Sequence, residues 1–182
     1  MLILASASPT RADILTAHGI AFVQRPTSAD EEGIVAATPK SFVYQATRLK
    51  MAHAVEAFGP EAHILCADTV VTAGGEILRK AATVDDARRT LRMQSGSETA
   101  ILTCTMLHTP ELDYIDLSAT VYDFSPFDDA HLEAYLQSGE WEGKAGACMV
   151  EGFCKPYIRE VRGLESCAMG LTVEKLIPFL EL

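Results

Sequence analysis

Two serines and an arginine near the start of the chain are spaced so that they could hold an anion. The run Leu4-Ala5-Ser6-Ala7-Ser8-Pro9-Thr10-Arg11 joins a short apolar strand to the start of a helix. Ser8 suits the N-cap position and Pro9 the first helical position, so free backbone N–H groups would point at a ligand. Arg11, one turn into the helix, could place its guanidinium on phosphate oxygens. The alternative is an ordinary capped helix after a first strand.

An aspartate interrupts the otherwise apolar segment Cys66-Ala67-Asp68-Thr69-Val70-Val71. An unpaired carboxylate in apolar surroundings is costly, so Asp68 should meet a cation, a metal ion or several N–H donors. Glu31 lies in the acidic run Asp30-Glu31-Glu32. If the fold brings it beside Asp68, the two carboxylates predict a magnesium or manganese site. The alternatives are an Asp68 satisfied by a turn and a solvated Glu31.

Four basic residues could turn inward to the same kind of ligand: Arg11, Lys50, Lys80 and Lys144. Small residues follow Lys144 in Gly143-Lys144-Ala145-Gly146-Ala147, which permits a close approach of the backbone to a ligand. Taken singly, residues of this kind are more often ordinary surface charges. Gathered at one site, the four would suit a triphosphate.

The elements that must position these residues alternate between strand and helix, without a repeat or a long linker. Turn residues at Gly74-Gly75 predict a hairpin. The predicted strands are Leu2 to Ala5, Ile20 to Pro26, His63 to Thr72, a return strand from Ile77, Ala100 to Leu107 and Ile115 to Phe124. The predicted helices run from Ser8 to Gly19, Pro39 to Phe58, Val84 to Met93, Ala130 to Leu136 and Thr172 to Leu180.

The composition restricts the class of protein. With 182 residues and 48% hydrophobic content, the chain predicts one α/β domain over residues 1–182, in one or two lobes. A net charge of −10 disfavours nucleic acid and acidic membranes as partners. No apolar run is long enough to cross a membrane, so we expect a cytoplasmic protein. The five cysteines lack a C-x-x-C pair, which predicts buried, inert thiols rather than disulfides or a zinc site.

Several ordered motifs along nearly the whole chain resemble the Maf family of nucleoside triphosphate pyrophosphatases, also described as septum formation inhibitors. The matching motifs are Leu4 to Arg11, Asp30-Glu31, Lys50 within Ala46 to Ala52, Ala67 to Val71, Gly75 to Lys80, Ser95-Gly96, Lys144 to Ala147, Glu151-Gly152-Phe153 and Met169-Gly170-Leu171.

The resemblance implies an elongated, mixed-sheet Maf/ITPase-like α/β fold with a cleft between two lobes, and a homodimer. It also implies metal-dependent hydrolysis of a nucleoside triphosphate to the monophosphate and pyrophosphate, with Mg or Mn as the cofactor. Asp68 would be the catalytic base, and Glu31 and Asp68 the metal ligands. The residues that would hold phosphates are Ser6, Ser8, Arg11, Lys50, Lys80 and Lys144.

Three positions that select the base in the family carry a mixed signature here. The group resembling dTTP/UTP pyrophosphatases has Arg, Thr and Gln there, and the 7-methyl-GTP group has Trp, Gln and Glu. This chain has Thr10, Thr69 and Glu151. The sequence therefore leaves the base open. Other departures from the family pattern are Ala81, Thr99, Gly143 and Thr172.

Two classes of function follow from the resemblance. The favoured one is the pyrophosphatase, acting on ordinary or modified nucleotides. The other is a nucleotide-binding regulator of cell division with weak or incidental hydrolysis. A pure binding protein has no need of a catalytic base, so the presence of Asp68 beside the basic set favours the enzyme.

Overall fold

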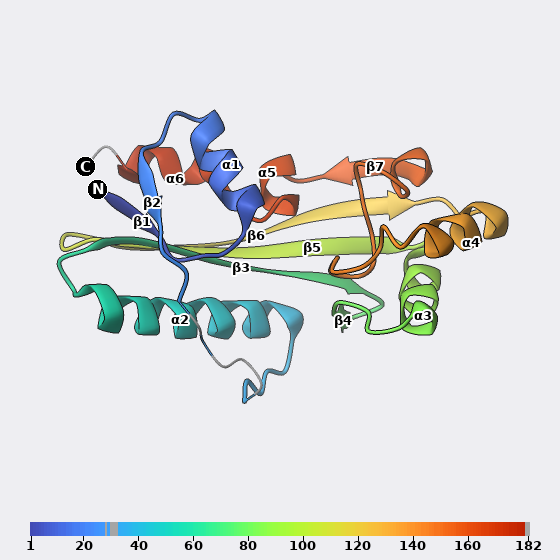
Figure 1. Cartoon of the computed structure of the whole chain (residues 1–182), viewed down its shortest axis with the longest axis horizontal. Helices are drawn as coiled ribbons and strands as arrows, with labels where there is room; N and C mark the ends of the chain where they lie inside the picture. The colour runs from blue at the N-terminus through green and yellow to red at the C-terminus, as the bar shows by residue number, and fades with distance from the viewer. Residues whose placement is uncertain (28, 30–32, 181–182) are drawn as a thin grey trace. The chain divides into compact units, whose positions relative to one another are not determined.

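The fold is mixed α/β and is built on one seven-stranded sheet, seen in a computed structural model that describes residues 1–27, 29 and 33–180 (Figure 1). The strands follow the order β2-β1-β3-β5-β6-β7, and β4 pairs with β3. Strand bounds are Leu2–Leu4 (β1), Phe22–Gln24 (β2), His63–Ala73 (β3), Glu76–Leu78 (β4), Glu98–His108 (β5), Asp113–Phe124 (β6) and Ile158–Arg162 (β7). Helix bounds are Pro9–Ala17 (α1), Pro39–Phe58 (α2), Val84–Gln94 (α3), Asp129–Ser138 (α4), Lys155–Tyr157 (η1, a 3-10 turn), Glu165–Ala168 (α5) and Val173–Leu180 (α6).

The chain divides into two compact units, and β3, β5 and β6 each contribute residues to both. Unit 1 takes its described residues from 1–69, 102–119 and 164–180. Unit 2 comprises residues 70–101 and 120–163. The single domain expected from the sequence thus contains two units. The predicted cleft between lobes stays a prediction.

Unit 1 is a sheet with helices on both faces. Strand β1 pairs in parallel with β2 and with β3, and α2 covers one face while α1 and α6 cover the other (Figure 1). Leu65 and Ala67 of β3 pack with Leu15 of α1 and Leu176 of α6. Ile64 and Cys66, the alternate residues, pack with Ala54 of α2. Because strand side chains alternate between faces, β3 supplies both cores.

Local sequence signals set the ends of the helices in unit 1. The Ser8 hydroxyl accepts from the Arg11 backbone N–H at 3.4 Å, and Pro9 takes the first turn. Helix α2 begins with Thr38 and Ser41, whose side chains each accept from the other's backbone N–H. This reciprocal capping satisfies two donors that a helix start leaves open. Both helix starts therefore follow from local capping chemistry.

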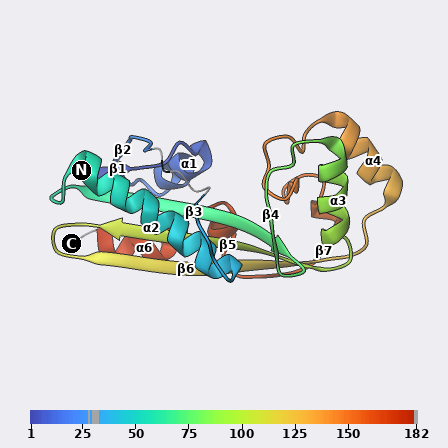
Figure 2. The ribbon, with the colours of Figure 1, turned by 90° about the horizontal axis from the view of Figure 1, so that it is seen from below.

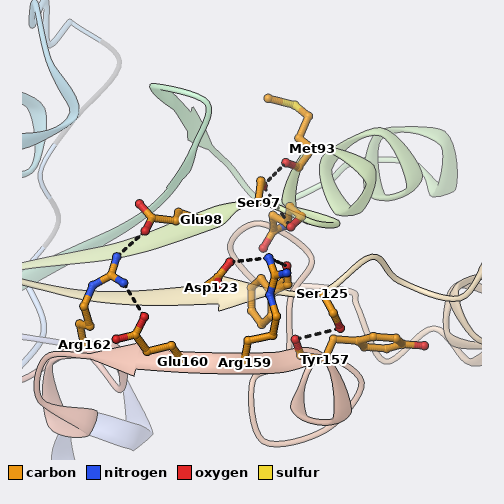
Figure 3. Close-up of polar contacts among 11 residues, drawn as sticks. Met93, Ser97, Glu98, Asp123, Ser125, Tyr157, Arg159, Glu160 and Arg162 are labelled. Atoms are coloured by element: carbon orange, nitrogen blue, oxygen red, sulfur yellow. Dashed lines mark hydrogen bonds and ion pairs between the residues drawn. The ribbon is translucent and has the colours of Figure 1, made fainter.

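Unit 2 contains the β3–β4 hairpin, helices α3 and α4 packed side by side, and the sheet edge formed by β7 (Figure 2). Ion pairs line that edge. Arg159 Nη2 contacts Asp123 Oδ1 at 2.9 Å, and Arg162 pairs with both Glu98 and Glu160 (Figure 3). Charged side chains on an edge strand discourage pairing with another chain.

The predicted helices and strands are confirmed, with ends shifted by a few residues. Strand β7, η1 and α5 were not predicted. Strand β7 is mostly exposed and charged, so it lacks the apolar alternation that marks a strand. Helix α5 and η1 are too short to show a helical period.

The expectation of five unpaired cysteines was wrong for two of them. Cys148 and Cys154 form a disulfide, with their Cα atoms 6.4 Å apart. A turn between Met149 and Cys154, closed by the hydrogen bond from Cys154 N–H to Met149 O, brings them together. Sequence spacing alone did not reveal this turn. The other three, Cys66, Cys104 and Cys167, are buried thiols, as predicted.

No helix in the described part of the chain is both long and apolar enough to cross a membrane.

Candidate active site

The first group of predicted residues meets at the end of β1. Arg11 Nη1 donates to Ser6 Oγ at 2.9 Å, and the Ser8 backbone N–H also donates to Ser6 Oγ, at 3.3 Å. Gln24, at the end of β2, donates from Nε2 to Ser6 O at 2.8 Å and thereby fixes the turn. The turn, the helix start and the guanidinium are thus assembled into one electropositive site, which is the arrangement that binds anions in other proteins.

Asp68 meets a cation, which is one of the three kinds of partner predicted from its place in an apolar strand. Lys50 Nζ of α2 lies 2.6 Å from Asp68 Oδ1, and the two side chains are 20% and 14% exposed. Lys50 lies on the side of α2 that faces the sheet, and Asp68 of β3 lies on the side of the sheet that faces α2. The proximity of the ammonium compensates for the loss of water around Asp68. This pair excludes the interpretation of Asp68 as a residue satisfied only by a turn.

Asp68 and Thr69 are chain neighbours that serve opposite faces of β3. Asp68 meets Lys50 on the α2 side, whereas Thr69 Oγ1 accepts from Arg11 Nη2 at 3.1 Å on the α1 side. Helices α1 and α2 lie on different faces of the sheet (Figure 1). The Lys50–Asp68 pair and the Arg11–Thr69 contact are therefore joined through the peptide bond between Asp68 and Thr69.

Cys66, on the same face of β3 as Asp68, is not a nucleophile in this site. Burial raises the pKa of the Cys66 thiol to about 12, against the smaller opposing effects of Lys50 and Arg11. The thiol is therefore protonated near neutral pH, and only the thiolate is strongly nucleophilic.

The two remaining lysines lie on neighbouring segments of unit 2. Lys80 and Ala145 form an antiparallel bridge, and the Gly146 backbone N–H donates to Arg79 O at 3.2 Å. Gln94, fully buried, donates from Nε2 to Gly146 O at 2.7 Å. Gly146 has φ +66°, and a Cβ there would lie 3.0 Å from Val71 Cγ1. Only glycine suits this crossing, which sets the segment carrying Lys144 against the one carrying Lys80.

Two of the predicted specificity residues, Thr10 and Thr69, belong to unit 1, and the third, Glu151, belongs to unit 2. Thr10 lies in the first turn of α1 and is half-buried, Thr69 contacts Arg11, and Glu151 of unit 2 is exposed in the turn closed by the disulfide. Their roles stay predictions.

The predicted metal site lies only partly within the described residues, because Glu31 falls outside them. Among residues 1–27, 29 and 33–180, no group of three or more His, Cys, Asp or Glu side chains could hold a metal ion. A magnesium site built from one carboxylate and substrate phosphates needs no such group, so Asp68 remains a suitable ligand.

Four residues that position the site were not assigned roles from the sequence: Gln24, Gln94, Thr103 and Gly170. Thr103 accepts or donates a hydrogen bond at 2.9 Å to Thr69, and Gly170 O accepts from Arg11 Nε at 2.8 Å. Gly170 stands within a motif shared with the family, which was a signal for it. The other three carry no local pattern, because their partners are distant in sequence.

The fold and the site define an α/β protein with a candidate anion site at the end of a parallel strand and, on the other face of the sheet, a lysine–carboxylate pair. The Ham1 protein of Staphylococcus aureus has a similar fold, with a TM-score of 0.50 over 68% of this chain and 71% of that one, at 10% identity.

The chain belongs to the Maf family, since the model described as "Maf-like protein" matches residues 1–182. A "Nucleoside triphosphate pyrophosphatase" of a Nitratiruptor species is 52% identical over 178 residues, which cover 97% of this chain and 96% of the relative. A "dTTP/UTP pyrophosphatase" of Anaeromyxobacter dehalogenans is 38% identical over 176 residues, or 93% and 87%. The resemblance seen in the sequence motifs is confirmed.

Proposed function

We propose that this protein is an enzyme that hydrolyses nucleoside triphosphates to nucleoside monophosphates and pyrophosphate. The names of the relatives support this activity and favour it over a nucleotide-binding regulator of cell division. The observation that carries it is the 2.6 Å pair of Lys50 and Asp68, one peptide bond from the residue that contacts Arg11.

Asp68 is the proposed base. Its carboxylate accepts a proton from a water molecule, whose oxygen forms a bond to the α-phosphorus as the bond from that phosphorus to the α–β bridging oxygen breaks. Pyrophosphate leaves with the electron pair of that bond. Lys50 holds the Asp68 carboxylate through Oδ1, which leaves Oδ2 as the proposed proton acceptor.

The electropositive turn neutralises the phosphates. Arg11, Ser6 and the start of α1 supply donors to phosphate oxygens, the interaction on which phosphoryl transfer chiefly depends. Ser8, Lys50, Lys80 and Lys144 remain proposed phosphate ligands as well. The bridge between Lys80 and Ala145 supports a common role for the two lysines of unit 2.

A divalent cation, Mg²⁺ or Mn²⁺, belongs to the proposal. Asp68, with Glu31 as the second proposed ligand, would hold it together with substrate oxygens. When bound, the ion neutralises charge on the phosphate groups.

The biological setting is also part of the proposal. The net charge of −10 supports a protein that does not bind nucleic acid or acidic membranes. The family resemblance supports a cytoplasmic homodimer, a connection with septum formation and the removal of modified nucleotides.

The test is product release from a panel of ordinary and modified nucleoside triphosphates, with Mg²⁺ or Mn²⁺. We expect equal amounts of monophosphate and pyrophosphate. Asp68→Asn should keep nucleotide binding and lose turnover by about 100-fold or more. Asp13→Asn, an exposed carboxylate change on α1, is the control and should keep turnover.

Three results would contradict the proposal. Release of diphosphate and orthophosphate would place cleavage at a different bond, and full turnover in Asp68→Asn would remove the base from that residue. Nucleotide binding without any release would support the regulator.

A further inference from the structure

A buried hydroxyl on β5 lies behind the site. Thr103 is fully buried, and its Oγ1 lies 2.7 Å from Cys167 O and 2.9 Å from Thr69 Oγ1. A backbone carbonyl can only accept a hydrogen bond, and a hydroxyl has one proton. Thr103 therefore donates to Cys167 O, and Thr69 must be the donor in the bond between the two threonines.

The direction of that bond determines what Thr69 offers to Arg11. Thr69 has given its one proton to Thr103, so its oxygen presents lone pairs on the other side. Arg11 Nη2, which can only donate, lies 3.1 Å away. The four groups thus form one chain of donors, from Arg11 through Thr69 and Thr103 to Cys167 O, with its direction set by the groups at both ends.

This row of hydrogen bonds fixes the Nη2 side of the Arg11 guanidinium. Two further acceptors hold the guanidinium: Gly170 O accepts from Nε at 2.8 Å, and Ser6 Oγ accepts from Nη1 at 2.9 Å. If Thr103 lost its hydroxyl, the Thr69 proton would lose its acceptor. Thr69 could then rotate and direct that proton toward Arg11, where two donors would oppose each other.

We propose that Thr103 is a positioning residue, which orients the phosphate-binding Arg11 through Thr69 without touching the substrate. This proposal rests on the proposed function, because that function makes the Arg11 guanidinium a phosphate ligand.

The variants that test it differ in one group. Thr103→Val removes the hydroxyl and keeps the shape of the side chain. Thr103→Ser keeps the hydroxyl and removes the methyl group. Thr105→Val is the matched control, since Thr105 is also fully buried, lies two residues further along β5 on the same face, and has its hydroxyl 3.2 Å from Thr172 Oγ1 instead.

We expect kcat/KM for the preferred triphosphate to fall about tenfold in Thr103→Val, chiefly through KM. Thr103→Ser should return it to within about threefold, and Thr105→Val should stay within about twofold of the unaltered protein. In an Arg11→Ala background, Thr103→Val should have no further effect, because the group it orients is gone. An equal fall with and without Arg11, or an equal fall in Thr105→Val, would overturn the proposal.

A second measurement does not depend on turnover. The NMR signal of the Arg11 Nε–H, whose proton is bound to Gly170 O, reports how firmly the guanidinium is held. We expect faster solvent exchange of this proton in Thr103→Val and no change in Thr105→Val. If no triphosphate is hydrolysed by the unaltered protein, the proposed function fails, and the exchange rate alone decides the positioning role. An unchanged rate in Thr103→Val would refute that role.

Discussion

Arg11 and Gly170 are 159 positions apart in sequence and are joined by a hydrogen bond of 2.8 Å from Nε to the carbonyl oxygen. Gly170 packs closely against both Arg11 and Thr69. A Cβ at Gly170 would lie 3.4 Å from Arg11 Nε and 3.2 Å from Thr69 Oγ1. The backbone at Gly170 therefore packs directly against the Arg11 guanidinium.

Gly170→Ala is expected to disturb Arg11. The backbone has φ +102°, so alanine is strained by about 1–3 kcal/mol, and its methyl group presses on the guanidinium. We expect lower stability in urea unfolding and a fall in kcat/KM of about tenfold.

Gly59→Ala separates the two effects. Gly59 has φ +89°, but a Cβ there would meet nothing within 4 Å. It should lose stability in the same range and keep its kcat/KM. Equal kinetic losses in both variants would show that the contact with Arg11 is irrelevant.

The Lys50–Asp68 pair should be energetically coupled. Urea unfolding of Lys50→Met, Asp68→Asn and the double variant gives the coupling free energy, which we expect to be about 0.5–3 kcal/mol for such a pair in contact. Removing one partner destabilises the protein because the other charge loses its compensation. Strictly additive effects would mean that the pair contributes nothing to folding.

We expect His108 to make the stability of unit 1 depend on pH. Its Nδ1 lies 2.6 Å from Asp113 Oδ1, and its Nε2 lies 2.9 Å from Pro60 O. Two acceptors favour the doubly protonated ring. The hydrogen bond to Asp113 is the main cause that raises the pKa of His108 above its ordinary 6.5, with burial opposing it and the Pro60 carbonyl adding to it.

A raised pKa in the folded state fixes the sign of this effect. The stabilisation is complete below about pH 6.5 and is lost as the pH rises through the folded pKa. The unaltered protein should therefore exceed Asp113→Asn in free energy of unfolding at acidic pH, and the difference should shrink above neutral pH. A difference that grows with pH would contradict this. An NMR titration of the His108 ring checks the pKa directly.

Glu151→Gln is expected to change which base is preferred. The Glu151 carboxylate only accepts hydrogen bonds, whereas the amide of glutamine also donates. Because Glu151 is exposed, the change should leave stability within about 0.5 kcal/mol. The measurement is kcat/KM across pyrimidine and purine triphosphates, with the exposed Glu76→Gln as the control. The same ranking in all three proteins would exclude Glu151 from selectivity.

Local chemistry made much of this fold predictable. The helix Pro39–Phe58 was predicted with the bounds it has, from apolar residues that recur at helical spacing. The caps at Thr38 and Ser41 and the glycine at position 59 account for those bounds in the structure. The sequence predicted that Asp68 would meet a cation, a metal ion or several N–H donors, because burying a carboxylate without a partner is costly, and the structure shows a cation. Lys50 was predicted only as a phosphate ligand, and its pairing with Asp68 was not predicted.

Other parts of the site depend on contacts that no local pattern records. Thr103 meets Thr69 across 34 positions, and its buried hydroxyl looks like that of any strand threonine until the strands are paired. The disulfide was missed for a similar reason, because it depends on an irregular turn. Strand β7 was missed because its stabilising contacts are ion pairs rather than apolar side chains.

The alternation of β3 has a consequence for changes in chain length. Inserting or deleting one residue between the β1-paired segment, which ends at Leu65, and Asp68 would exchange the faces of everything beyond it. The carboxylate would turn toward α1 and the hydroxyl toward α2, so Lys50 and Arg11 would both face the wrong partner. Substitutions can change Asp68 or Thr69 separately, but a change in length would alter the alternation of side chains along β3 and so affect both residues at once.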